Sequence, residues 1–220
     1  MDKMAKAFTR IGKDIAIAIK QGTSDPATNA RLRIAIQNAK GVNMPKDRID
    51  AAIKRATSKD SKNLEEINYE GYAPHGIAVY VETATDNPTR TVANVRVIFS
   101  RGNGNLGNSG SIDFLFERKG EFVIPKSAIN LDEMELDLID LGAEEIEPDE
   151  DKYIVYTKFS DFGNMNKGLE ERGIVVESAA VKRFPLSTKE LPEEQENEVL
   201  ELIAKLEEDD DVQAVYHTLA

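Results

Sequence analysis

Hydrophobic positions in the first 56 residues recur at the spacing of amphipathic helices. Within residues 4–20 they lie three or four apart and form one apolar stripe: Met4, Phe8, Ile11, Ile15 and Ile19. Further stripes run through residues 32–39 and 49–56. Gly41 stands where a helix C-terminal glycine is expected, and Pro45 stands in the first turn of the following helix. The pattern predicts a small three-helix bundle.

The period changes after the polar segment "TSKDSKN", which is typical of a linker. "GIAVYVETAT" (76–85) is apolar and β-branched, which predicts a buried strand, and residues 86–102 predict a capped helix. "GNGNLGNSG" (102–110) predicts a flexible turn, and "SIDFLFE" (111–117) alternates as a strand.

Residues 120–185 predict the ferredoxin-like order of strand, helix, strand, strand, helix, strand. An acidic amphipathic helix (193–212) and a last strand (212–219) follow, and no other sheet is left for them to join. We therefore expect an α+β fold in which a three-helix bundle precedes two α/β domains, the last ferredoxin-like and inserted in the middle one. The predicted domains are a basic helical domain (1–62), an α/β domain (63–124 and 186–220) and the inserted α/β domain (125–185).

Charge is distributed unevenly along the 220 residues, whose formal net charge is -12. Residues 1–62 contain about 14 Lys and Arg residues and about 6 Asp and Glu residues, so their net charge is roughly +8. The rest of the chain then has a net charge of roughly −20. Such asymmetry suggests that the basic part meets a polyanion, and the acidic part would restrict how that polyanion docks.

Several classes of protein are excluded by composition. The chain has no cysteine, which excludes disulfides, thiolate nucleophiles and cysteine metal sites. It has no apolar run of roughly 18 residues and no secretory signal pattern at its N-terminus. We therefore expect a cytoplasmic protein with no membrane partner.

No motif predicts catalysis. "GNGNLG" (102–107) matches G-x-G-x-x-G by letter, but a predicted helix precedes it and a strand follows, which is the reverse of a dinucleotide site. We interpret it as a mobile turn, or as a loop that approaches a nucleic acid closely. His75 and His217 lack catalytic neighbours, and "EEDDD" (207–211) lacks the spacing of a calcium loop and is interpreted as a solvated helix end. We expect no enzyme activity, cofactor, metal or small-molecule substrate.

The cations of the predicted helices have few acidic neighbours at helical spacing, apart from Asp50 with Lys54. Arginine grips phosphate through a planar fork, so nucleic acid is the favoured partner. A solvated face, or binding to an acidic protein surface such as the chain's own, is the alternative. The predicted phosphate contacts are Lys6, Arg10, Lys13, Lys20, Arg31, Arg33, Lys40, Lys46, Arg48, Lys54 and Arg55.

Three stretches resemble the YebC/PmpR family of probable transcriptional regulatory proteins, which is related to the mitochondrial translational activator of cytochrome oxidase. They are "NARLRIAIQNAKGVNMPKDRIDAAIKRA", "YEGYAPHGIAVYVETATDNPTRTVANVRVIFSRGNGNLG" and "DDDVQAVYHTL". The resemblance covers nearly the whole chain and implies a helical domain and two α/β domains, with the third inserted in the second. Family members usually begin with a further basic segment, so we expect that such a segment is missing here.

The resemblance implies a non-enzymatic, DNA-binding transcriptional regulator. The alternative that it implies is a ribosome-associated translation factor that binds ribosomal or transfer RNA and relieves stalling on proline-rich stretches. No predicted helix has the pattern of a major-groove recognition helix. A protein–protein adaptor that uses its acidic surface is a third hypothesis. The resemblance also suggests a second nucleic-acid surface, which comprises Thr89, Arg90, Arg101, Asn103 and Asn105. Arg90 and Arg101 could instead only cap a helix end.

Overall fold

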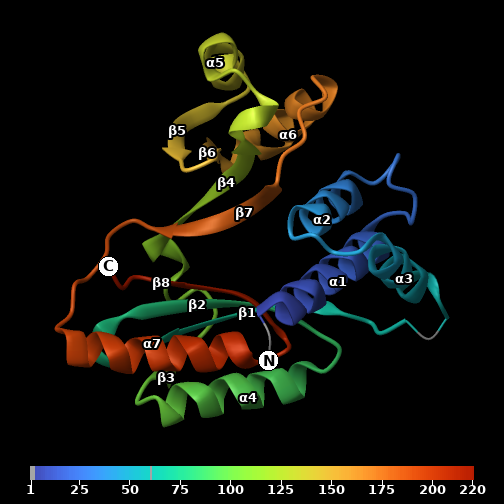
Figure 1. Cartoon of the computed structure of the whole chain (residues 1–220). Helices are drawn as coiled ribbons and strands as arrows, with labels where there is room; N and C mark the ends of the chain where they lie inside the picture. The colour runs from blue at the N-terminus through green and yellow to red at the C-terminus, as the bar shows by residue number, and fades with distance from the viewer. Residues whose placement is uncertain (1–2, 60) are drawn as a thin grey trace. The chain divides into compact units, whose positions relative to one another are not determined.

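The computed structural model describes residues 3–59 and 61–220 (Figure 1). Met1, Asp2 and Asp60 lie outside the described residues, and with them the start of the predicted helical domain and part of the predicted linker. The expected α+β class is confirmed, since three helices precede two four-stranded sheets. None of the helices in the described part is long and apolar enough to cross a membrane.

The chain divides into two compact units that differ from the predicted domain bounds. The first comprises Met1–Ile17, Arg55–Glu117 and Phe184–Ala220, and the second comprises Ala18–Lys54 and Arg118–Arg183. The division into three domains stays a prediction.

The three predicted N-terminal helices are confirmed as α1 (Lys3–Gln21), α2 (Ala30–Gly41) and α3 (Lys46–Thr57). Asn29 caps α2, because its side chain accepts a hydrogen bond from the Leu32 amide. α1 buries a face that its apolar stripe did not predict. Ile17 packs with Leu64 and Ala84, so this part of α1 belongs to the core of the first unit.

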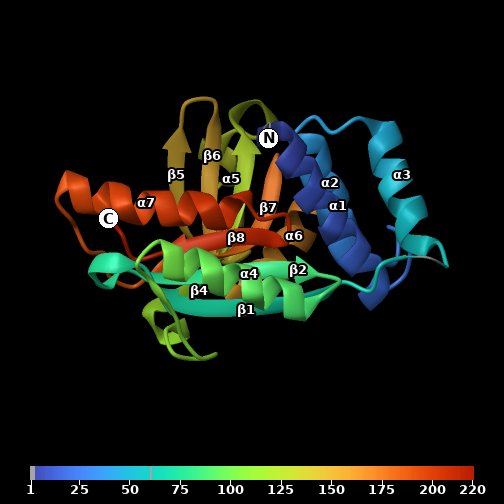
Figure 2. The ribbon, with the colours of Figure 1, turned by 90° about the horizontal axis from the view of Figure 1, so that it is seen from below.

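The sheet of the first unit has the order β3-β1-β2-β8, and its neighbouring strands are antiparallel. Its strands are β1 (Glu65–Tyr72), β2 (Ala78–Thr85), β3 (Asn105–Leu106) and β8 (Val212–His217). Helices α4 (Pro88–Arg101) and α7 (Glu193–Glu208) lie together over one face of this sheet (Figure 2). The expected return of the terminal helix and strand to the earlier sheet is confirmed.

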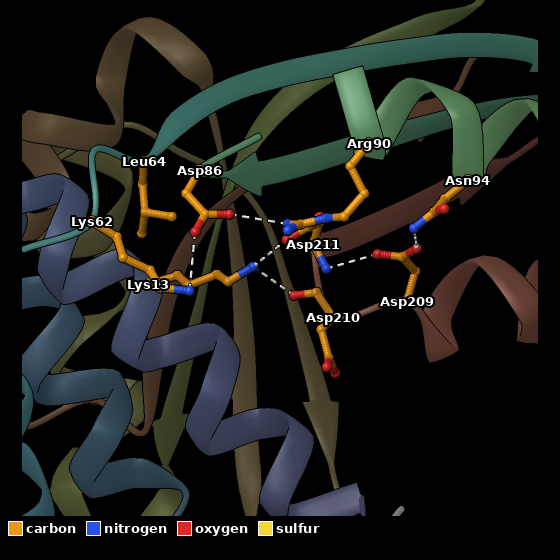
Figure 3. A pocket seen from close by; sticks show the side chains of 9 residues that line it. All are labelled: Lys13, Lys62, Leu64, Asp86, Arg90, Asn94, Asp209, Asp210 and Asp211. Atoms are coloured by element: carbon orange, nitrogen blue, oxygen red, sulfur yellow. Dashed lines mark hydrogen bonds and ion pairs between the residues drawn. The ribbon is translucent and has the colours of Figure 1, made fainter. Parts of the chain in front are cut away.

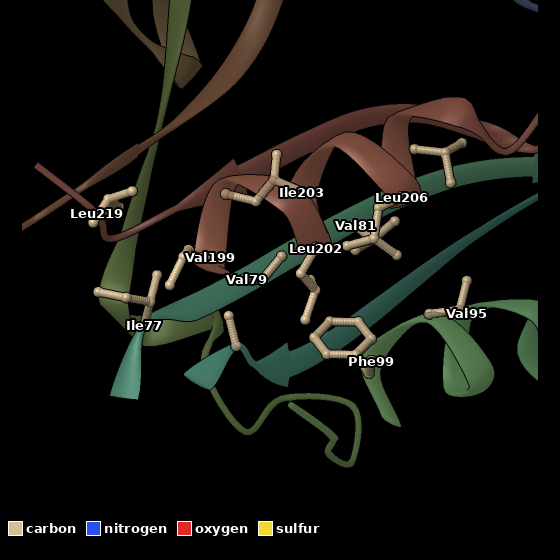
Figure 4. Close-up of a cluster of buried hydrophobic side chains, with 12 residues drawn as sticks. Ile77, Val79, Val81, Val95, Phe99, Val199, Leu202, Ile203, Leu206 and Leu219 are labelled. Carbon is tan, nitrogen blue, oxygen red and sulfur yellow. The ribbon is translucent and has the colours of Figure 1, made fainter. Parts of the chain in front are cut away.

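Apolar side chains between the sheet and the two helices form the core of this unit (Figure 4). Val79 and Val81 of β2 pack against Phe99 of α4 and against Leu202 and Leu206 of α7. These side chains are almost completely buried, so the hydrophobic effect holds both helices on the strands.

The inserted part of the chain is ferredoxin-like, as predicted. Its elements are β4 (Phe116–Pro125), α5 (Leu131–Asp140), β5 (Ala143–Asp149), β6 (Lys152–Lys158), α6 (Phe162–Glu171) and β7 (Ser178–Pro185). The sheet order is β5-β6-β4-β7. The predicted strand over 111–117 is wrong in part, because Asp113–Leu115 forms a 3-10 helix and β4 begins at Phe116. The Glu70 carboxylate accepts hydrogen bonds from the Ile112 and Asp113 amides and so holds this turn.

α2 packs against β7 within the second unit. The Asn38 side chain donates to the Ala179 carbonyl oxygen at 2.9 Å and accepts from the Ala179 amide at 2.8 Å. A Cβ at Gly41 would overlap the carbonyl oxygen of Glu177. Gly41 is the last residue of α2, as expected, but it is this close contact that requires a glycine there, because Gly41 does not have the positive φ of a left-handed cap. Asn43 has the left-handed φ, at 56°.

Replacing Gly41 by Ala is expected to destabilise the second unit by about 2 kcal/mol, because the backbone of Glu177, just before β7, must move to admit the methyl group. Faster hydrogen exchange of α2 and β7 amides would report this loss. Gly12→Ala is the matched control, since no atom other than those of its chain neighbours and of the surrounding backbone of α1 lies within 4 Å of the added Cβ. That variant should be neutral or more stable, by up to about 1 kcal/mol. Equal behaviour of the two variants would contradict the assigned contact.

Candidate nucleic-acid interface

Cations on α1 lie against the end of α7 within the first unit. Lys6 Nζ donates to the Glu207 carbonyl oxygen at 2.8 Å, and Arg10 donates to the same oxygen at 3.1 Å. Arg10 Nε also donates to the Val212 carbonyl oxygen at 3.2 Å. Carbonyls in the last turn of a helix have no intrahelical partner and carry the negative end of its dipole, so cations stabilise them. Lys6 and Arg10 are therefore already engaged within the first unit, and phosphate contact by them stays a prediction.

Lys13 is also engaged, one turn further along α1. Its Nζ donates to the carbonyl oxygens of Ala84 at 2.7 Å and Asp210 at 2.6 Å, and to Asp211 Oδ1 at 3.1 Å. Lys6, Arg10, Lys13 and Ile17 share one face of the helix, because they are spaced four, three and four residues apart. This face docks onto the first unit instead of facing solvent.

Asp211 is the centre of a buried polar cluster, and its residue is only 6% exposed. Besides Lys13, its carboxylate accepts hydrogen bonds from Arg90 Nη2 at 2.8 Å and Thr91 Oγ1 at 2.9 Å. Thr91 Oγ1 also lies 2.7 Å from Thr85 Oγ1. The interpretation of residues 207–211 as a solvated helix end is therefore wrong for Asp211. A run of acids in the sequence gave no sign that one of them is buried.

The charge of Asp211 is stabilised by its neighbours. Burial alone would raise the pKa of this carboxyl, but hydrogen bonds from Arg90, Thr91 and Lys13 outweigh burial and lower the pKa below its ordinary value. The pKa of Asp86 is also lowered, chiefly by hydrogen bonds from Lys62 and Arg90. Both carboxylates are therefore ionised at neutral pH.

A pocket of about 430 Å³ opens beside this cluster (Figure 3). It is lined by Lys13, Lys62, Leu64, Asp86, Arg90, Asn94, Asp209, Asp210 and Asp211. Asp86 lies 3.0 Å from both Lys62 and Arg90. Each cation of the pocket thus faces a carboxylate of the same unit. The partners of Arg90 fit its alternative role at a helix end, and phosphate contact by Arg90 stays a prediction.

The glycine-rich segment after α4 is held in place, which contradicts the expected flexible turn. Leu106 pairs with Gly71 of β1. A Cβ at Gly104 would lie 2.5 Å from the Tyr72 carbonyl oxygen, and one at Gly102 would lie 2.7 Å from Leu202. These glycines are therefore required by close packing, whereas Asn103 has the positive φ, at 56°.

The side chains predicted for the second surface lie on the outside of the first unit. Thr89 is exposed in the first turn of α4, and Arg101, Asn103 and Asn105 are exposed at its other end and in the following loop. No side-chain hydrogen bond joins these four to other described residues. They are available for a ligand, whereas Arg90 is held by carboxylates.

The cations of α2 and α3 divide into engaged and available side chains. Arg33 lies 3.2 Å from Glu170 and donates to the Pro26 carbonyl oxygen at 2.8 Å, and Arg31 donates to Gln21. Lys20, Arg48 and Lys54 also have interaction partners. In these two helices, the exposed cations with no side-chain hydrogen bond or ion pair among the described residues are Lys40, Lys46 and Arg55.

The two histidines lie apart from these surfaces. His75 Nε2 lies 2.7 Å from a Glu198 carboxylate oxygen, and burial lowers the pKa of His217. Within residues 3–59 and 61–220, no three His, Cys, Asp or Glu side chains are placed to hold a metal ion.

Comparisons with known proteins agree with the resemblance noted in the sequence. Residues 1–59 match the N-terminal domain of TACO1/YebC proteins, and residues 64–219 match their second and third domains. A probable transcriptional regulatory protein of Cytophaga hutchinsonii is 57% identical over 219 residues, which cover 100% of this chain and 92% of the relative. One of Myxococcus xanthus is 51% identical over 224 residues, covering 100% and 93%.

The solved structures extend the similarity to the fold. The crystal structure of the conserved hypothetical protein Aq1575 of Aquifex aeolicus matches with a TM-score of 0.84 and 38% identity, covering 98% of this chain and 90% of that one. The matched domains and the full-length relatives together identify the family. The chain belongs to the TACO1/YebC family.

Proposed function

We propose that this protein is a non-enzymatic, cytoplasmic regulator of gene expression that binds nucleic acid through cations of α2 and α3. The observation that carries the proposal is the exposure of Lys40, Lys46 and Arg55, none of which has a carboxylate partner among the described residues. Phosphate contacts supply most of the affinity for either DNA or RNA, so unpaired cations are the groups that such a ligand requires. The names of the relatives, which are probable transcriptional regulatory proteins, support DNA as the first ligand.

The predicted contacts do not contribute equally in this proposal. Lys6, Arg10 and Lys13 already donate to carbonyl or carboxylate oxygens of the first unit, so a phosphate would have to displace these bonds. The same holds for Arg33, which has Glu170 as its partner. We therefore assign the main phosphate contacts to the available cations of α2 and α3. Arg101, Asn103 and Asn105 provide a second contact.

Affinity for duplex DNA is expected to fall with salt, with a slope of log affinity against log salt near −4 to −5 if about five phosphates are neutralised. Replacing Lys40, Lys46 and Arg55 by Ala should reduce the magnitude of that slope by about 2.7, because each lost contact removes about 0.9. Fluorescence anisotropy with a labelled duplex, repeated with an RNA hairpin, measures both slopes.

The matched control removes three cations outside the predicted set, through Arg96→Ala, Lys167→Ala and Lys205→Ala. It changes the net charge equally, and all three residues are exposed. An equal reduction of the slope in the control would contradict the assignment to α2 and α3. Tighter, less salt-sensitive binding of the RNA hairpin would favour the alternative of a translation factor that binds ribosomal or transfer RNA. No salt-dependent binding to either probe would refute the function and favour a protein–protein adaptor.

A further inference from the structure

The inserted ferredoxin-like part of the chain contains a segment whose charged side chains are all acidic. Residues 131–151, which comprise α5, β5 and the turn after it, include eleven Asp and Glu residues and no Lys or Arg. Some of these carboxylates have local partners, such as Asp137 with Arg172 at 3.4 Å and Glu144 with Lys158 at 3.8 Å. Those on the outer face of α5 do not.

Two aliphatic side chains lie in the middle of this outer face. Leu136 is 76% exposed and Ile139 is 52% exposed. They are three residues apart and therefore neighbours on the helix surface. At about 100° per residue, the flanking positions on both sides are acidic. The flanking carboxylates, none of which pairs with another described residue, are Asp132, Glu133, Glu135 and Asp140.

The aliphatic pair and the later part of its acidic rim, Glu135 and Asp140, are not explained by the stability of the fold, whereas Asp132 and Glu133 lie in the first turn of α5, where the helix dipole favours anions. The inner side of α5 already supplies the core through Leu138, which packs with Phe122 and Val155. Four like charges on one face repel one another, and Asp140 stands at the C-terminal end of the helix, where the dipole disfavours an anion. An apolar centre with a charged rim is instead the arrangement of a binding patch.

The charge of the rim identifies the partner. We propose that the outer face of α5 docks a basic segment of another protein, a helix whose apolar side chains three or four residues apart meet Leu136 and Ile139 while its Lys and Arg side chains meet the acidic rim. Nucleic acid and anionic lipid surfaces are repelled by this face. Addition of a partner strand to the sheet is disfavoured, because the edge strand β5 carries Pro148, a register irregularity and a row of Glu side chains.

This surface goes beyond the proposed function and does not rest on it. A basic surface that binds a polyanion and an acidic surface that binds a polycation would let one chain join a nucleic acid to a basic protein. The two surfaces use different residues, so each can be removed without the other.

The test uses the full chain, labelled for NMR, and a synthetic helical peptide of about four turns. The peptide carries Leu at positions i, i+3, i+4 and i+7 and Lys on its remaining positions. We expect saturable amide shifts that are largest at residues 132–140. Leu136→Ser with Ile139→Ser should weaken binding by about tenfold. Val175→Ser is the matched control, since Val175 is 72% exposed outside α5, and it should leave affinity unchanged.

A second peptide of the same composition, with its Leu residues spread around the helix, separates docking from charge attraction. It should bind at least about tenfold more weakly. Equal binding of both peptides, largest shifts on the acidic helix α7, or absence of binding would each overturn the proposal. Unchanged amide spectra outside α5 in the Ser variants would show that the domain remains folded, so that lost binding reports the surface.

Discussion

Replacing Asp211 by Asn is expected to lower the free energy of unfolding of the first unit by about 3 kcal/mol. Asp211 is only 6% exposed, and its carboxylate accepts hydrogen bonds from Lys13, Arg90 and Thr91. Asn offers one acceptor oxygen in place of two and turns an NH₂ donor toward these donors. Lys13, which is largely buried, then loses its carboxylate partner, while Arg90 keeps only Asp86. Leaving a buried charge without its partner is costly.

Native-state hydrogen exchange of β2 and β8 amides measures this loss within the first unit alone. Asp210→Asn is the matched control. Asp210 is the preceding residue and its side chain is exposed, while Lys13 uses only its backbone carbonyl oxygen. This control should change stability by no more than about 0.5 kcal/mol. If both variants lose equal stability, the cluster around Asp211 is not what holds α1 on the sheet.

The same carboxylate makes the first unit sensitive to acid. The pKa of Asp211 is lower in the folded state than in the unfolded state, so its stabilisation is fully present above the unfolded pKa of about 3.9. That stabilisation is lost as pH falls through the folded pKa. The wild-type chain should therefore lose more stability in acid than Asp211→Asn does. Parallel pH profiles of the two proteins would contradict the assigned pKa shift.

Periodicity predicted the helices and the insertion because both depend on local patterns and on simple topology. The apolar stripes of α1 and α2 and the strand–helix order of the inserted ferredoxin-like part are properties of short segments. β8 could be assigned to the first sheet since no other sheet remained. β1 was not predicted, because "EEINYEGY" mixes acids, Asn and Gly and buries only part of its length.

The candidate interface was harder to predict, because whether a cation is available for phosphate depends on partners that are distant in the sequence. Lys6, Arg10 and Lys13 have the spacing of an exposed cationic face, and nothing local distinguishes them from Lys40 or Lys46. Their acceptors lie roughly 200 residues away in the sequence, at the turn between α7 and β8. Long cationic side chains can reach such acceptors from a helix face that also buries an aliphatic residue. An isoleucine within a cationic stripe, as at position 17, is the signal that could have identified the docked face.

Replacing Glu70 by Gln is expected to destabilise the segment after β3 by about 3 kcal/mol. Glu70 is 3% exposed, and its carboxylate accepts hydrogen bonds from three backbone amides: Gly110 at 2.6 Å, Ile112 at 2.8 Å and Asp113 at 3.0 Å. Hydrogen bonds to an ionised acceptor are stronger than neutral ones, and an amide group can supply only one acceptor oxygen. At least one amide therefore loses its partner, and the NH₂ group of Gln faces an N–H donor.

The loss of stability in Glu70→Gln should appear as faster hydrogen exchange of the Gly110, Ile112 and Asp113 amides, while β2 amides are much less affected. Glu65→Gln is the matched control, because Glu65 lies in the same strand with an exposed side chain that makes no hydrogen bond to other described residues. Loss of protection at these three amides in the control as well would show that Glu70 does not organise the turn. Since the turn follows directly from the loop that carries Asn103 and Asn105, Glu70→Gln should also weaken DNA binding, whereas Glu65→Gln should not. Unchanged DNA affinity in Glu70→Gln, with the amides deprotected, would remove this loop from the proposed interface and leave α2 and α3 as its site.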